Sequence, residues 1–174
     1  MLAVSINKLS KTYNNKNVLK NISLDIEKGK IYGILGKNGA GKTTLLKIIC
    51  GLTKISRGDI YVFGKVPTTG NNNINYLSEN ISLYLHLTAY ENLKIIYLME
   101  GKKVNKKEIY NVLEKVSLLH MHNKHVRTFS LGMKRRLQLA MVLCTNQKDL
   151  LILDEPTNGL DFDGMEWFKS TISF

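Results

Sequence analysis

The segment from Gly36 to Thr43, which reads GKNGAGKT, constrains the fold of this chain more than any other segment. It matches G-x-x-x-x-G-K-[ST], the pattern of a phosphate-binding loop, in which glycines let successive backbone N–H groups point at an anion. The apolar run Ile31 to Leu35 precedes the loop, and Leu45 to Cys50 follows it with helical character. The sequence therefore predicts a buried strand, a phosphate loop and a helix, in that order, within an α/β fold.

The residue types in this loop suit a nucleotide with its metal ion. Lys42 adds a positive charge for the β- and γ-phosphates, and Thr43 supplies a hydroxyl for Mg²⁺. The helix that follows presents its N-terminal N–H groups and the positive end of its dipole to the same phosphates. The residues expected to contact the nucleotide here are Gly36, Lys37, Asn38, Gly39, Ala40, Gly41, Lys42, Thr43 and Thr44.

Length and composition allow one sizeable core. The chain has 174 residues, of which 44% are hydrophobic and 22% charged, as is usual for a globular protein. No stretch approaches the roughly 18–20 apolar residues of a membrane span, and the N-terminus has no signal-peptide core, so we expect a cytosolic location. Cys50 and Cys144 lie among apolar residues at helical spacing, which favours buried reduced thiols over a disulfide or metal ligands.

The net charge of +11 admits an acidic partner such as nucleic acid, anionic lipid or a nucleotide. The densest basic run contains Lys102, Lys103, Lys106 and Lys107, with no interleaved aromatic residues that could stack on bases. We therefore expect a solvated face there and no nucleic-acid partner.

Hydrophobic periodicity predicts the remaining elements. Alternating apolar residues indicate half-buried strands over 2–13 and 21–26, and shorter strands are expected over 59–63 and 75–78. From Thr88 to about residue 147 the pattern is helical. Thr88 begins a capping-box sequence, and a second helix start lies at Ser130.

The apolar run Leu150 to Leu153 ends in Asp154 and Glu155, which is typical of a strand buried on both faces of a parallel sheet. Ligands of open α/β sheets bind at the C-terminal ends of such strands. An acidic pair there could instead be a helix cap. Because a phosphate loop lies upstream, we interpret Asp154 as a metal ligand and Glu155 as the group that takes a proton from water.

In their order and combination, these segments resemble the ATP-binding-cassette (ABC) ATPases over nearly all of the chain. Tyr13 stands where that family has its adenine-stacking aromatic residue, and 36–43 is its Walker A loop. Residues 129–133 correspond to its signature, 150–154 to its Walker B strand and 159–161 to its D-loop. Glu155 then matches the catalytic glutamate, and Asp161 is expected to contact the nucleotide.

The resemblance implies a P-loop fold with a mixed or parallel core sheet, an antiparallel β-subdomain and an inserted helical subdomain, with the last strand or strands missing. We expect one ABC ATPase domain over 1–174. Residues 1–78 and 148–174 would form the nucleotide-binding core, and 79–147 the helical signature subdomain.

The signature departs from the usual LSGGQ form, because Leu131 and Met133 occupy its third and fifth positions. It keeps Ser130 and Gly132. In the family this serine hydroxyl and glycine N–H bind the γ-phosphate held by a second subunit in a head-to-tail dimer. The form FSLGMKRRL is similar to that of bacterial drug-efflux and lantibiotic-immunity transporters.

Glu79 stands where the family's Q-loop usually has glutamine, and a glutamate there also resembles the lantibiotic-immunity ATPases. In the family this loop touches the metal ion and the coupling helix of the membrane subunit. We therefore expect Glu79 to contribute to the metal and nucleotide site.

The family's switch histidine, some 30 residues after the D-loop, has no counterpart before the chain stops at Phe174. We therefore expect weak ATP hydrolysis by this chain alone and low solubility without a partner. Apolar residues expected to be partly exposed are Phe162, Met165, Trp167, Phe168 and Ile172.

The resemblance implies an ATPase subunit that uses ATP and Mg²⁺ to power export of a peptide or drug through separate multi-span membrane subunits. It would pair with a second ABC ATPase subunit and lie on the inner face of the cell membrane. The alternative is a truncated regulatory fragment that binds nucleotide with little turnover. ABC proteins that act on DNA or ribosomes are a third class, but they usually carry two cassettes or long insertions.

Overall fold

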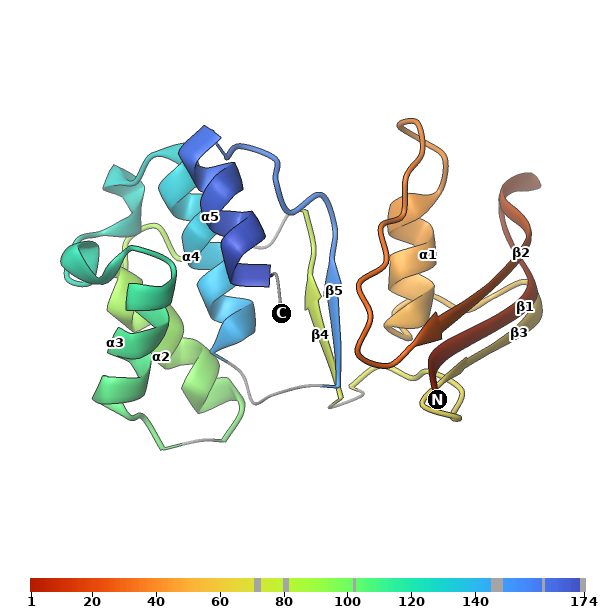
Figure 1. Ribbon diagram of the computed structural model, residues 1–174, viewed down its shortest axis with the longest axis horizontal. Helices are drawn as coiled ribbons and strands as arrows, with labels where there is room; N and C mark the ends of the chain where they lie inside the picture. The colour runs from red at the N-terminus through yellow and green to blue at the C-terminus, as the bar shows by residue number, and fades with distance from the viewer. Residues whose placement is uncertain (71–72, 80–81, 102, 145–148, 161, 173–174) are drawn as a thin grey trace. The chain divides into compact units, whose positions relative to one another are not determined.

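The computed structural model describes residues 1–70, 73–79, 82–101, 103–144, 149–160 and 162–172 (Figure 1). The chain forms two compact units, Met1–Ile74 and Asn75–Phe174. Each unit has its own apolar core.

The first unit is built on a three-stranded antiparallel sheet. Its strands are β1 (Leu2–Tyr13), β2 (Lys16–Glu27) and β3 (Arg57–Val62), in the order β2-β1-β3. Asn14 and Asn15 close the β1–β2 hairpin with φ angles of 45° and 61°, and asparagine tolerates this left-handed backbone well. The strands predicted over 2–13 and 59–63 are confirmed, and the one predicted over 21–26 is part of a longer strand.

Alternation along these strands produces the core of the unit. Ile6 of β1 lies opposite Ile60 of β3, and both are buried, as are Val4 and Val62. Helix α1 (Lys42–Ile49) buries Leu45, Ile48 and Ile49. This apolar stripe at helical spacing is what fixes the helix that follows the loop.

The strand predicted over Ile31 to Leu35 is wrong. No strand is assigned to these residues, and Ile31 and Leu35 are 70% and 95% exposed. A strand buried on both faces needs hydrogen-bonded neighbours at its edges, and none of the described strands pairs with this run. The apolar pattern indicates a preference for burial, but it does not identify a strand that could pair with this run.

In the second unit, β4 (Ile74–Leu77) and β5 (Leu150–Leu153) lie side by side and run in the same direction (Figure 1). Both strands were predicted. The prediction that β5 is buried on both faces is wrong for Leu151, which is 36% exposed, whereas Ile152 is buried. A two-stranded sheet covers only part of such a strand.

The described residues of the second unit also form the helices α2 (Ala89–Met99), α3 (Lys106–Lys115), α4 (Leu131–Leu143) and α5 (Phe162–Ile172). Two short 3₁₀ turns, Leu119–Met121 and Val126–Thr128, connect α3 to α4. The longest helix among the described residues, α4, has 13 residues. Within this part of the chain, no helix has the length and apolar composition needed to cross a membrane.

Side-chain caps define where these helices begin. The Thr88 hydroxyl accepts from the Glu91 N–H, and the Glu91 carboxylate accepts from the Thr88 N–H, so the predicted capping box is confirmed. Asn105 caps α3, and Ser130 caps α4 by accepting from the Met133 N–H. The second predicted helix start is therefore also confirmed.

The helices share one apolar core. Leu93 of α2, Leu113 of α3 and Leu137 of α4 are completely buried in it. Trp167 of α5 packs against the same cluster, and its indole N–H donates to the Lys115 carbonyl at 2.8 Å. These contacts fix α5 to the helical core.

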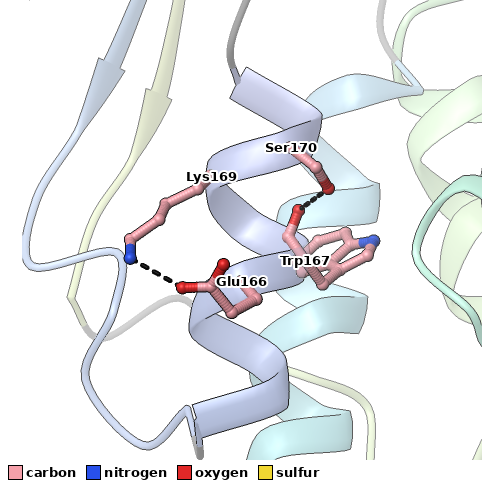
Figure 2. Close-up of polar contacts among 4 residues, drawn as sticks. All are labelled: Glu166, Trp167, Lys169 and Ser170. Carbon is pink, nitrogen blue, oxygen red and sulfur yellow. Dashed lines mark hydrogen bonds and ion pairs between the residues drawn. The ribbon is translucent and has the colours of Figure 1, made fainter.

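Figure 2 shows polar contacts between neighbouring turns of α5. Lys169 and Glu166 form an ion pair at 2.7 Å, and the Ser170 hydroxyl donates to the Trp167 carbonyl. Both charged side chains are more than half exposed, so their pair adds little to stability. Of the terminal apolar residues expected to be exposed, Phe162 is 78% exposed, and Met165, Trp167 and Phe168 are half-buried. The side chain of Ile172 lies outside the described part.

Both cysteines are free and buried, as predicted. Burial raises the pKa of the Cys50 thiol to about 12. This thiol therefore remains protonated at neutral pH, which suits a core residue rather than a nucleophile.

Candidate nucleotide-binding site

One part of the candidate site is the loop from Gly36 to Thr44. Gly39 and Gly41 adopt left-handed φ angles of 81° and 94°, which let the backbone turn sharply before α1. The Lys42 ammonium donates to the Gly36 carbonyl at 2.9 Å and lies 3.5 Å from the Lys37 carbonyl, so the lysine folds back over the loop. The Lys42 side chain thus connects the start of the helix to the first residues of the loop.

The N-terminus of α1 suits an anion. Its N-cap is Gly41, whose position carries no side-chain capping bond, and the first turn contains no acidic residue. The first N–H groups of a helix have no partner within the helix, and they carry the positive end of its dipole. The start of α1 therefore has no capping side chain and no acidic residue to compete with a phosphate, and its N–H groups and dipole attract one.

The close approach of β2 explains why a glycine stands at position 41. A Cβ atom there would lie 2.7 Å from Cδ2 of Leu19 and 3.0 Å from the Val18 carbonyl oxygen. Leu19 also pairs with Lys11 across the hairpin. The contact therefore places the end of the β1–β2 ladder next to the loop.

Tyr13 ends β1, two residues beyond Lys11, and its ring is 44% exposed. The Lys11 ammonium lies 4.6 Å from the ring centroid, a cation–π distance. The structure therefore places an exposed aromatic ring in the same unit as the loop, as an adenine-stacking role would need.

In the second unit, the two predicted carboxylates follow β5 directly. Asp154 is 2% exposed, and its N–H donates to the Leu77 carbonyl of β4 at 2.9 Å. The Tyr76 hydroxyl donates to its carboxylate at 3.3 Å. Glu155 is partly exposed and has a φ angle of 47°, a left-handed backbone that is uncommon for glutamate.

Sequence analysis missed Arg135, which connects this segment to α4. Its guanidinium donates to three consecutive carbonyls, those of Asp154 at 3.1 Å, Glu155 at 2.6 Å and Pro156 at 3.1 Å. It also donates to the Gln138 side chain at 3.0 Å and lies 3.4 Å from the Glu79 carbonyl.

Burial lowers the pKa of Arg135, and the carboxylates of Glu79 and Asp154 oppose that shift. A signal for this residue was present in the sequence. Arg135 lies four and seven residues before Leu139 and Val142, both buried, so it falls on an apolar stripe of α4. An arginine on such a stripe predicts a buried polar contact.

The start of α4 and the loop after Glu155 lie together. Ser130 is exposed at the N-cap, and the adjacent Leu131 is 70% exposed. A Cβ on Gly159 would lie 2.9 Å from the Leu131 side chain, and one on Gly132 would lie 3.6 Å from the Gly159 carbonyl. Leu131 and Gly132 at the start of α4 are therefore close to Gly159 within this unit.

The predicted site residues thus fall into two groups. The loop and Tyr13 belong to the first unit. The second unit holds Glu79, Ser130, Gly132, Asp154 and Glu155, and the Glu79 side chain is exposed. Asp161 lies outside the described residues.

The donor set suits Mg²⁺, a hard cation that takes oxygen ligands and often uses only one or two protein groups beside phosphates. Thr43 offers a partly exposed hydroxyl at the start of α1, and Asp154 offers a buried carboxylate. Among the residues described, no three His, Cys, Asp or Glu side chains gather around a common point. Each of these two residues, taken in its own unit, offers the kind of oxygen ligand that Mg²⁺ prefers.

Comparison with known proteins agrees with this geometry. The sequence model of the ABC transporter family matches residues 19–158. The ABC transporter ATP-binding protein YcbN of Bacillus subtilis is 47% identical over 162 residues, which cover 91% of this chain and 52% of that protein. The lantibiotic transport ATP-binding protein SrtF of Streptococcus pyogenes is 40% identical over 170 residues, which cover 97% of this chain and 73% of that protein.

A solved structure of a putative ABC transporter ATP-binding protein from Pyrococcus furiosus superposes with a TM-score of 0.85 at 37% identity. The match covers 97% of this chain and 83% of that one. The chain spans about half the length of YcbN. By its sequence and its fold, this chain belongs to the ATP-binding proteins of the ABC transporter family.

Proposed function

We propose that this chain binds ATP with Mg²⁺ and hydrolyses it to power export of a peptide or drug through separate membrane subunits. The observation that carries the proposal is the loop before α1, where two left-handed glycines and the folded-back Lys42 form an anion site. Membership of the ABC transporter family supports ATP as the ligand. The name of SrtF, a lantibiotic transport protein, supports a peptide as the exported substrate.

The roles of the residues follow from their chemistry. The loop N–H groups and Lys42 hold the β- and γ-phosphates, and the Tyr13 ring stacks on adenine. The ligands proposed for Mg²⁺ are the Thr43 hydroxyl and the carboxylates of Asp154 and Glu79, and the ion when bound would neutralise charge on the phosphates.

Glu155 is the proposed base. A water oxygen attacks the γ-phosphorus, the Glu155 carboxylate takes the water proton, and the bond to the ADP oxygen breaks. The exposure of Glu155 next to the buried Asp154 supports this division of work, since one carboxylate remains accessible to water.

The proposed partners are multi-span membrane subunits and a second ATPase subunit, which would place the chain on the inner face of the cell membrane. Ser130, Gly132 and Asp161 would act at the subunit contact. The exposure of Ser130 and Leu131 at the start of α4 supports this role. In this proposal residues 1–78 and 148–174 form the nucleotide-binding core, and 79–147 form the helical subdomain.

Hydrolysis of ATP by wild-type, Glu155→Gln and Glu114→Gln proteins tests the proposal. Glu155→Gln keeps the shape and removes the base, so turnover should fall about 10²- to 10⁴-fold while ATP still binds. Glu114 is exposed on α3, and its substitution should leave turnover unchanged. Equal rates for wild type and Glu155→Gln would remove Glu155 from the chemistry. Binding without turnover in the wild type would favour a regulatory fragment instead.

A further inference from the structure

The backbone at Glu155 requires an explanation. Its φ angle of 47° belongs to the left-handed region, which is uncommon for a non-glycine residue such as glutamate. The residue lies two positions after the end of β5, and the Asn158 N–H donates back to its carbonyl at 3.2 Å. This turn bond holds the backbone carbonyl of Glu155 and does not by itself set where the side chain points.

Arg135 supplies the additional constraint. Its guanidinium spans the carbonyls of Asp154, Glu155 and Pro156, and the contact to Glu155 is the shortest at 2.6 Å. The guanidinium is a rigid planar fork with several donors, so it fixes the relative orientation of the three peptide groups. A lysine ammonium is a single point charge and could not span them in the same way.

Arg135 is itself held in place. It is 4% exposed, and the Gln138 side chain one turn later on α4 accepts from its Nη1 at 3.0 Å. Its burial next to Leu139 on the same stripe leaves the side chain little freedom. The position of the guanidinium therefore follows the position of α4.

We propose that Arg135 is a positioning residue, which aims the Glu155 carboxylate by holding the backbone of residues 154–156 against α4. The inference rests on the proposed function, because it takes Glu155 as the base. It adds that the orientation of this base depends on a side chain of the signature helix. Among the described residues, the hydrogen bonds of the Arg135 guanidinium go to backbone carbonyls and to Gln138, so Arg135 would act through the backbone of Glu155.

Amide hydrogen exchange tests the clamp without any need for turnover. Arg135→Gln removes the fork, so the Asn158 amide, which bonds to the Glu155 carbonyl, should exchange at least about 10-fold faster as the segment opens locally. Exchange at Ala140, in the middle of α4, should be unchanged. Arg127→Gln removes the same charge from an exposed side chain and should alter neither amide.

Kinetics test the catalytic consequence. Because a misplacement of about 1 Å can cost on the order of 10²-fold in rate, Arg135→Gln should lower kcat about 10- to 100-fold. KM for ATP should stay within about 2-fold of the wild-type value, because the substitution should not change how ATP binds in the ground state. Arg135→Lys keeps the charge but not the planar fork, so it should recover at most part of the kcat that Arg135→Gln loses. In a Glu155→Gln background, Arg135→Gln should cause no further loss.

The outcomes separate this inference from the proposed function. If Glu155→Gln keeps full turnover, the assignment of the base fails, whatever Arg135 does. If Glu155→Gln loses turnover while Arg135→Gln keeps kcat, the positioning role alone is overturned. Unchanged Asn158 exchange in Arg135→Gln also overturns it. Should Arg135→Gln unfold α4, as faster Ala140 exchange would show, Gln138→Ala loosens the fork more gently, and the same Asn158 readout decides.

Discussion

Two neighbouring carboxylates after β5 have different surroundings, and the difference is consistent with the separate roles proposed for them. Asp154 is 2% exposed and bonded to the Tyr76 hydroxyl, whereas Glu155 is partly exposed on a left-handed backbone. A buried, oriented carboxylate suits a metal ligand, and an accessible one suits proton transfer from water. At the scale of single residues, environment rather than residue type therefore distinguishes the two.

The exposed ring of Tyr13 leads to a prediction about affinity for ATP. Stacking of a base on an aromatic ring is worth roughly 1–3 kcal/mol, so Tyr13→Ala should weaken ATP binding about 5- to 150-fold. Tyr13→Trp should bind nearly as well as wild type. Tyr61→Ala is the matched control, because Tyr61 belongs to the same sheet and is 45% exposed. Titration calorimetry that gave one affinity for all four proteins would exclude Tyr13 from the site.

At the scale of elements, the sequence correctly predicted the strands and helix caps that depend on short-range interactions. The alternation in β1 and β3 and the caps at Thr88 and Ser130 are short-range patterns, and the structure has them where expected. The strand predicted over 31–35 is wrong because a buried strand needs a neighbouring strand to pair with, and the apolar pattern does not identify that neighbour.

The candidate site was predictable to a similar extent. The sequence predicts the loop, Asp154 and Glu155 as site residues because motif spacing reflects phosphate and metal chemistry, and these assignments stay predictions. Arg135 was missed because a basic residue in a helix is usually solvated, and its three carbonyl partners lie about 20 residues away in sequence. The apolar stripe of α4 indicates that Arg135 is buried, but the identity of its carbonyl partners is set by tertiary packing, which periodicity does not encode.

The capping box at α2 predicts how stability depends on pH. Hydrogen bonds from the backbone and side chain of Thr88 lower the pKa of Glu91. A carboxylate whose pKa is lowered on folding stabilises the protein above its unfolded pKa, and this contribution is lost as the pH falls through the folded value. Glu91→Gln should therefore be less stable than wild type at pH 7. The difference should shrink as the pH falls below the ordinary glutamate pKa of about 4.3.

Urea unfolding at several pH values measures this difference, with Glu114→Gln as the control on an exposed helix face. Thr88→Ala removes the other half of the box and should cost about 1 kcal/mol at pH 7. A Glu91→Gln deficit that did not change between pH 7 and pH 3 would show that the carboxylate charge is irrelevant to the cap.

At the scale of the whole molecule, the chain is an ABC-family ATP-binding protein with candidate site residues in both of its compact units. The glycine loop before α1 belongs to the first unit, and Asp154, Glu155 and α4 belong to the second. The proposed function assigns roles to residues of both units and, in the proposed dimer, to a second subunit.

The proposed dimer makes a prediction about assembly. ATP should promote dimers of Glu155→Gln, because the nucleotide is retained between subunits. Adding Ser130→Arg should prevent them, since it places a bulky charged side chain at the exposed start of α4. Asn111→Arg, on an exposed position of α3, should not. Light scattering that showed monomers of Glu155→Gln at every ATP concentration, including with the membrane subunit present, would argue against this assembly.

The central claim is that the loop before α1 binds ATP, and the most direct measurement is titration calorimetry of Mg-ATP into wild-type, Lys42→Ala and Lys47→Ala proteins. Hydrogen bonds to charged groups are worth about 1.5–3 kcal/mol, so Lys42→Ala should bind roughly 10- to 150-fold more weakly than wild type. Lys47 is exposed in the last turn of the same helix, and its substitution should leave the affinity unchanged. Equal affinities for wild type and Lys42→Ala, or the absence of binding by the wild type, would contradict the account.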